Sequence, residues 1–328
     1  MIKNLVLSCG GVAGITYIGC LQILYKNKLL DNLENVLGCS VGSMFSLFIC
    51  LGYTYEELYK LMLNIDINII NDIDYEDITN FVHKYGFSSG NKIIKILKII
   101  VKAKLEKEDI TFRELFEKTN KNLIIASTCL NSSKVEYFSF KDNPDMLVLD
   151  AVRMSISIPF LFHPFKYKDK LYVDGALLNG YPIDYFKDNI DETLGILINN
   201  DNDVLIKNLE DYTLSVLFCG LMNNKKFMYE KYRENTILVS IQSELDCINF
   251  FLSKEDKERL IKCGNNCCMK YLESDFFNKH IPLENINEDS NHDSNQDSNQ
   301  ELNNKKEENQ QDNQQDDNLE ADNLEANN

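Results

Sequence analysis

The sequence lacks the features that mark several large classes of protein. Its longest apolar stretch, residues 45–51, falls far short of the roughly 18 residues that suggest a membrane-spanning helix. Its N-terminus has no basic segment followed by an apolar core and a small-residue cleavage site, so we expect no signal peptide. The ten cysteines include no C-x-x-C pair, which predicts buried thiols of a reducing compartment and no metal site, even at the cluster of Cys263, Cys267 and Cys268. We therefore expect a cytoplasmic protein.

Basic residues are fewer than acidic ones, with 34 Lys and Arg against 51 Asp and Glu. The 328-residue chain carries a net charge of −17, of which −12 comes from residues 284–328, where 14 acidic residues accompany two lysines; residues 1–283 therefore carry only −5. A weakly acidic domain without a basic stripe argues against a dedicated nucleic-acid-binding protein. From residue 284 onward Asn, Asp, Gln and Glu dominate, which predicts a disordered acidic tail. A protein that works through interactions of this tail is one alternative function.

Strand-like and helix-like segments alternate along residues 1–283. Apolar patterns predict strands at residues 2–8, 123–128, 135–138, 193–199 and 236–241 and helices at residues 15–25, 54–63, 147–154, 203–221 and 254–273. Residues 165–173 alternate through a polar turn, which is typical of a hairpin. Thr54 with Glu57, and Thr111 with Glu114, have the spacing of capping boxes. Strands interleaved with helices predict an α/β fold with a mainly parallel sheet.

A G-x-S-x-G motif runs from Gly38 to Gly42 and places Ser40 between a short apolar strand and a helical pattern. This arrangement is typical of a nucleophile elbow, in which a sharp strand-to-helix turn exposes the serine Oγ and the glycines leave room for the turn. The serine would also lie at a helix N-terminus, which favours developing negative charge. The alternative is a chance pentapeptide.

A glycine-rich turn follows the first predicted strand and contains Gly10, Gly11 and Gly14. Consecutive glycines let backbone N–H groups converge on one oxyanion and leave space for an ester. The competing interpretation is a dinucleotide-binding loop. That loop needs G-x-G-x-x-G, and Ser8 occupies its first position, so we expect no cofactor.

Two later segments complete the candidate site. Asp174, Gly175 and Ala176 follow the predicted hairpin, where an aspartate before a glycine serves either as a turn residue or as a functional carboxylate. Residues 155–164 carry two prolines around an aromatic run, which defines a rigid apolar loop suited to core packing or to an acyl pocket.

Along the chain, the glycine-rich turn comes first, then G-x-S-x-G, then the proline-flanked apolar loop and last Asp174-Gly175-Ala176. In this chain order the four motifs resemble the patatin-like phospholipase family over about residues 4–200. The resemblance implies a three-layer α/β fold in residues 1–283, with a central, mainly parallel sheet flanked by helices. It also implies a lipid acyl hydrolase of the phospholipase A type that forms a covalent acyl-enzyme on a phospholipid or another lipid ester and needs no cofactor. The implied roles are nucleophile for Ser40, base for Asp174 and oxyanion-hole donors for Gly10 and Gly11.

Two positions depart from the family pattern. Cys9 stands where the first glycine of the oxyanion loop is usual, and Ala13 stands where Lys or Arg is frequent. These departures leave a second alternative, a catalytically weakened protein that binds lipid in the same pocket. Hydrolysis of any ester would separate this lipid-binding alternative from the hydrolase.

The sequence has only four histidines. A triad of Ser40, Asp174 and His280 is a further alternative, since His280 follows Asp174 in the chain, and His83 and His163 are better explained as surface or pocket residues. With aspartate as the base, we expect activity to persist at mildly acidic pH, because an aspartate stays ionised there.

Residues 92–104 predict a helix that is both basic and very apolar, with Lys95, Lys98 and Lys102 at helical spacing. Such a helix can lie in a membrane interface, and peripheral membrane contact is one interpretation. The alternative is a core-packed helix with a solvated lysine edge.

Overall fold

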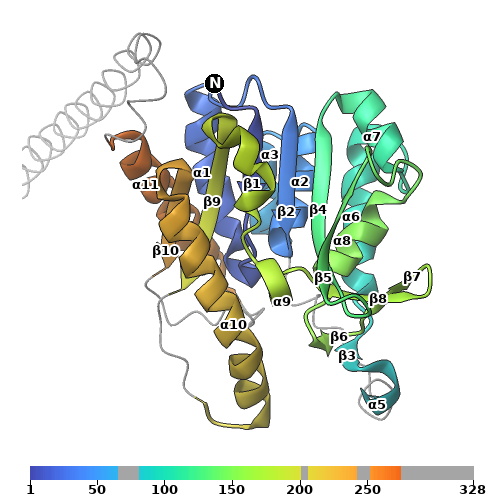
Figure 1. Cartoon of the computed structure of the whole chain (residues 1–328). Helices are drawn as coiled ribbons and strands as arrows, with labels where there is room; N and C mark the ends of the chain where they lie inside the picture. The colour runs from blue at the N-terminus through green and yellow to red at the C-terminus, as the bar shows by residue number, and fades with distance from the viewer. Residues whose placement is uncertain (66–80, 201–205, 242–251, 275–328) are drawn as a thin grey trace, which may run out of the picture. The chain divides into compact units, whose positions relative to one another are not determined.

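A computed structural model describes residues 1–65, 81–200, 206–241 and 252–274. The acidic tail and His280 lie outside the described residues. Helices flank a central mixed sheet, so the predicted α/β class with a mainly parallel sheet is confirmed (Figure 1).

The parallel core of the sheet consists of five strands: β10 (Thr236–Ile241), β9 (Thr193–Asn200), β1 (Asn4–Leu7), β2 (Asn35–Cys39) and β4 (Asn122–Cys129). Their side chains are almost all buried, as parallel sheets covered on both faces require. Three antiparallel strands extend the sheet beyond β4: β5 (Lys134–Ser139), β7 (Phe165–Tyr167) and β8 (Lys170–Asp174). β3 (Gly86–Ser88) and β6 (Phe160–Phe162) form a separate parallel pair.

Helices cover both faces of this sheet. The ones between residues 1 and 120 are α1 (Thr16–Lys26), α2 (Val41–Cys50), α3 (Tyr55–Asn64), α5 (Phe81–Lys84), α6 (Asn91–Leu105) and α7 (Phe112–Thr119), with the 3-10 helix η1 (Gly11–Ile15). The later ones are α8 (Val148–Ser155), α9 (Ala176–Asn179), α10 (Leu209–Lys231) and α11 (Lys254–Leu272), with the 3-10 helices η3 (Ile183–Glu192) and η4 (Arg233–Asn235). α10 and η3 cover the face that carries Val6, Leu37 and Ile124, since Met228 and Ile183 pack in one core cluster with these three side chains.

Local sequence signals agree with the elements. Both predicted capping boxes form, at the N-termini of α3 and α7. The hairpin of β7 and β8 turns at Lys168 and Asp169, which both have positive φ, as a two-residue type I′ turn requires. The helix predicted at residues 203–221 is wrong in its bounds, because α10 begins at Leu209 and continues to Lys231. The pairing of β3 with β6 has no signal in either short segment, since the contact is non-local.

The basic helix predicted at residues 92–104 corresponds to α6, which buries four apolar residues on one face: Ile93, Leu97, Ile100 and Val101. Three of its lysines form ion pairs: Lys98 with Asp109, Lys102 with Glu108 and Lys104 with Glu57. This pattern favours a core-packed helix with a solvated edge.

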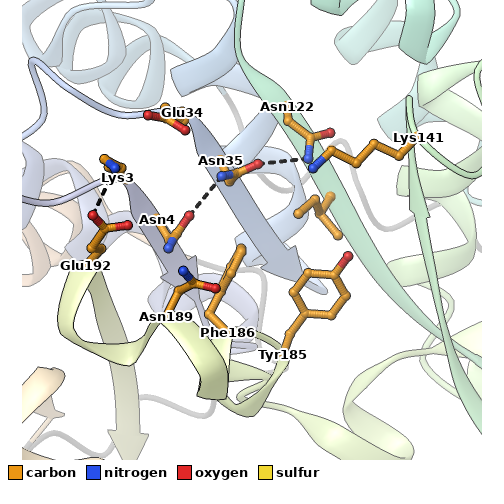
Figure 2. A pocket seen from close by; sticks show the side chains of 11 residues that line it. Lys3, Asn4, Glu34, Asn35, Asn122, Lys141, Tyr185, Phe186, Asn189 and Glu192 are labelled. Carbon is orange, nitrogen blue, oxygen red and sulfur yellow. Dashed lines mark hydrogen bonds and ion pairs between the residues drawn. The ribbon is translucent and has the colours of Figure 1, made fainter.

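A row of polar side chains crosses the sheet at the amino ends of the parallel strands (Figure 2). Thr193, Asn4, Asn35 and Asn122 are each the first residue of their strand and are register partners from one strand to the next. Asn122 donates to Asn35 at 2.9 Å, Asn35 to Asn4 at 2.8 Å and Asn4 to Thr193 at 3.1 Å. Every hydrogen bond in the row therefore runs in the same direction.

The three asparagines line a pocket of about 330 Å³ with residues of η3, including Tyr185 and Phe186 (Figure 2). Its charged groups are two lysines and two glutamates, so it favours neither sign of charge. It lies at the amino edge of the parallel strands, whereas Ser40 follows the carboxyl end of β2 and Asp174 is the last residue of β8, so it is separate from the candidate site.

Candidate active site

Ser40 and Asp174 meet at the carboxyl edge of the sheet. Ser40 follows β2 and caps α2 with φ 55° and ψ −128°, a conformation that places a non-glycine residue in a strained turn. Its Oγ donates a hydrogen bond of 2.6 Å to Oδ2 of Asp174. Ser40 is 5% exposed and Asp174 2% exposed, so the pair lies in a largely water-excluded site.

The elbow needs its flanking glycines. A side chain at Gly38 would overlap the backbone of Gly42. One at Gly42 would lie 2.6 Å from the carbonyl oxygen of Ser8, the residue after β1. Backbone therefore approaches backbone on both sides of Ser40, and larger residues would push the turn open.

β8 positions Asp174. It pairs antiparallel with β4, with Asp174 opposite Ser127, and the Asp174 N–H donates to the Ser157 carbonyl at 2.8 Å. Oδ1 accepts a 2.8 Å hydrogen bond from the Ala176 N–H. A side chain at Gly175 would lie 2.5 Å from the carbonyl oxygen of Ala126, so a larger residue at position 175 would push β8 away from β4.

Burial raises the pKa of Asp174 to about 7, because the buried carboxylate loses its hydration, while hydrogen bonds from Ser40 and the Ala176 N–H act in the opposite direction. The expectation that an aspartate base keeps activity at mildly acidic pH does not agree with this raised pKa. It used the pKa of a solvated aspartate, and a 2% exposed carboxyl is not solvated.

The glycine-rich turn lies directly beside the elbow. A side chain at Gly14 in η1 would overlap Val41, the residue after the serine. Gly10 and Gly11 are partly exposed, and their N–H groups have no hydrogen-bond acceptor within the described residues. Gly11 has φ 54°, which favours glycine. These free N–H groups could donate to a bound oxyanion.

The two departures from the family pattern do not disturb this turn. Cys9 is 5% exposed and packs with a small apolar cluster that includes Cys39 and Leu221. Ala13 is buried at 3% exposure. A side chain is thus tolerated at position 9, whereas at Gly10 it would lie 2.8 Å from Ile198.

Two residues of α8 whose roles no motif in the sequence indicates also support the site. Ser155 accepts a 2.9 Å hydrogen bond from the Ser40 N–H and donates a 2.7 Å bond to the Ala126 carbonyl. Arg153 is 5% exposed and donates to the Ser89 and His163 carbonyls and to the Ser157 hydroxyl. Burial lowers the pKa of Arg153 to about 10. Arg153 is a basic residue between apolar neighbours in the predicted helix, and Ser155 has no comparable signal in the sequence.

No histidine is among the hydrogen-bond partners of Ser40 and Asp174 within the described ranges. His83 is exposed on α5, and the backbone carbonyl of His163 accepts a hydrogen bond from Arg153.

Comparison with known proteins decides the family. The patatin-like phospholipase family model matches residues 5–187, which span both Ser40 and Asp174. The chain belongs to this family. None of the helices in the described ranges is both long and apolar enough to span a bilayer.

Viral proteins are among the similar sequences. An uncharacterised protein of Acanthamoeba polyphaga mimivirus is 32% identical over 80% of this chain and 91% of its own length. A probable lipid hydrolase of Invertebrate iridescent virus 6 is 29% identical over 80% and 90% of the two chains. The crystal structure of VipD from Legionella pneumophila superposes with a TM-score of 0.57 at 19% identity, over 83% of this chain and 67% of VipD, which shows a shared fold.

Proposed function

We propose that the protein is a serine hydrolase that cleaves fatty-acyl esters of phospholipids or related lipids through a Ser40–Asp174 dyad. The observation that carries this proposal is the 2.6 Å hydrogen bond between the two side chains inside a buried elbow. Membership of the family and similarity to a probable viral lipid hydrolase support the lipid substrate.

In the proposed reaction, ionised Asp174 takes the proton of Ser40 as the serine Oγ attacks the ester carbonyl. The N–H groups of Gly10 and Gly11 stabilise the tetrahedral oxyanion. Asp174 then returns the proton to the departing alcohol, which leaves an acyl group on Ser40. Water attacks this acyl-enzyme, Asp174 takes a proton from the water, and collapse of the second tetrahedral intermediate releases the fatty acid and returns a proton to Ser40.

A fluorophosphonate probe tests the nucleophile, because it labels only an activated serine. Labelling of the wild-type protein at Ser40, lost in Ser40→Ala and strongly reduced in Asp174→Asn, is the expected result. A folded wild-type protein that neither takes the label nor hydrolyses any ester would instead favour the lipid-binding alternative, in which the pocket holds lipid without turnover.

The remaining alternatives concern residues outside the described ranges. If His280 completes a triad, His280→Ala alone should remove turnover, whereas the dyad predicts little change. If the acidic tail carries the function, removal of residues 284–328 should abolish that function and spare hydrolysis. We propose that residues 1–283 suffice for chemistry, because every group in the proposed mechanism lies before residue 177.

Membrane contact through α6 is a second proposal. Its exposed Ile99 and Lys95 support contact, but the ion pairs of Lys98 and Lys102 reduce the free positive charge. Binding to anionic vesicles that falls with salt and with replacement of all three lysines by Glu would favour contact. Binding that is unchanged would leave α6 as a packing element.

A further inference from the structure

Lys225 lies on the buried face of α10, where its helical neighbours at positions 221, 228 and 232 are apolar core residues. Lys225 is only 4% exposed, and no carboxylate forms an ion pair with it in the part of the chain that the structure describes. Burying an unpaired ammonium group is costly, so a lysine kept on such a face needs a specific contact.

Lys225 contacts the backbone at the start of the glycine-rich turn. Its Nζ lies 3.5 Å from the carbonyl oxygen of Cys9, and the hydroxyl of Ser8 donates to the same oxygen at 2.9 Å. Two donors from different elements therefore hold the carbonyl that belongs to the peptide between Cys9 and Gly10.

A peptide unit is planar and trans, so its C=O and N–H groups point in opposite directions. Fixing the Cys9 carbonyl therefore also fixes the direction of the Gly10 N–H. A cation on the carbonyl draws electron density from the peptide and makes the N–H a stronger donor, as in other cooperative hydrogen-bond chains.

We propose that Lys225 is a positioning residue of the oxyanion hole, which orients and polarises the Cys9–Gly10 peptide so that the Gly10 N–H binds the developing negative charge. This inference rests on the proposed function. The substrate carbonyl is neutral and the transition state is negative, so the effect falls on the transition state rather than on substrate binding. Lys225 itself need not touch the substrate.

Lys225→Met tests the proposal, because methionine keeps a long apolar stem and removes the charge. The matched control is Lys226→Met, which changes an exposed lysine of the same helix. The substrate for the kinetic measurements is a short-chain ester. Two ligands separate binding of the transition state from binding of the substrate. A trifluoromethyl ketone forms a tetrahedral oxyanion on Ser40, whereas an unreactive ether analogue does not.

For Lys225→Met we expect kcat to fall by about 10- to 100-fold, in the range typical of a weakened oxyanion hole, with KM changed less than about twofold. Affinity for the trifluoromethyl ketone should fall by a similar factor, affinity for the ether analogue should stay unchanged, and Lys225→Arg should recover part of kcat. Lys226→Met should match the wild type in all four measurements.

Several results would overturn the proposal. One is a folded Lys225→Met with wild-type kcat; another is an equal loss of affinity for ketone and ether, which indicates general damage to the pocket. If Lys225→Met does not fold, Lys225→Gln and Lys225→Arg give the same comparison, and equal kcat in these two variants contradicts a role for charge. If the wild type itself shows no Ser40-dependent hydrolysis, the proposed function fails rather than this inference.

Discussion

The hydroxyl of Ser155 accepts a hydrogen bond of 2.9 Å from the backbone N–H of Ser40, 115 positions away in the chain. The same hydroxyl donates to the Ala126 carbonyl, so one buried side chain ties the strained elbow to strand β4. The elbow is therefore held by α8 as well as by its own glycines.

Replacing Ser155 by Ala should weaken both fold and catalysis. Two buried backbone groups would lose their partner, which we expect to lower the free energy of unfolding by about 1–3 kcal/mol. A looser elbow should also reduce kcat by about tenfold, because even a small displacement of the serine Oγ from its reactive position slows the reaction. Denaturant unfolding and ester kinetics measure the two effects. The exposed Ser132→Ala serves as the control and should change neither.

The pH profile should follow the ionisation of Asp174. Because burial raises its pKa to about 7, we expect kcat/KM to be constant at higher pH and to fall about tenfold per pH unit well below 7. A histidine base would give a similar profile, so the shape alone cannot separate them. The discriminating measurement repeats the profile with His83, His163 and His280 replaced together by Gln. A lost or shifted acid limb in that variant would contradict the dyad.

Asp174→Asn should stabilise the protein while removing its activity. The folded-state pKa of Asp174 is above the usual 3.8, so the folded state penalises the ionised form and its stability falls as pH rises toward 7. Asparagine avoids that penalty. We expect the free energy of unfolding to rise by about 2 kcal/mol at pH 8, with the gain shrinking as pH falls from 7 toward 4.

Thermal unfolding of wild type and Asp174→Asn across this pH range measures the difference. Asp188→Asn, at an exposed position of η3, is the control and should show no pH-dependent gain. A gain that is the same at pH 4 and pH 8 would argue against a charge penalty.

Asn35→Ala should destabilise the fold without affecting chemistry. The substitution removes the asparagine that links Asn4 and Asn122 in the row of polar side chains. It leaves Oδ1 of Asn4 and Nδ2 of Asn122 without their hydrogen-bond partners, and both residues are only 4% exposed. We expect a loss of about 2–4 kcal/mol in the free energy of unfolding and an unchanged kcat at temperatures where the variant is folded. Asn189→Ala, an exposed residue that lines the same pocket, is the control.

Local signals in the sequence predicted many of the helices, strands and turns of the fold. The capping boxes and the hairpin turn depend on residues a few positions apart, and they appear where expected. The glycine elbow is also a local signal. Its hydrogen bond with Asp174 was anticipated only through the family resemblance, since 134 positions separate the two residues.

Properties that depend on burial or on distant contacts were not predictable. The pKa of Asp174 was misjudged because it depends on desolvation by elements far apart in the chain. The support from Ser155 and the contact of Lys225 with Cys9 join residues more than 100 positions apart. α10 was assigned the wrong bounds because its long surface mixes polar and apolar residues with little periodicity.

The row of polar side chains at the amino edge also marks the register of the strands that lead to the candidate site. Each of its members begins a strand, and each bond joins register partners, so a slip of one residue in any strand would separate amides and turn core side chains outward. The starting level of β2 determines where that strand ends, and hence the level at which Ser40 emerges. β4 is fixed in the same way and fixes β8, which ends at Asp174. The level at which Ser40 and Asp174 meet therefore corresponds to the register that the polar row marks at the opposite edge of the sheet.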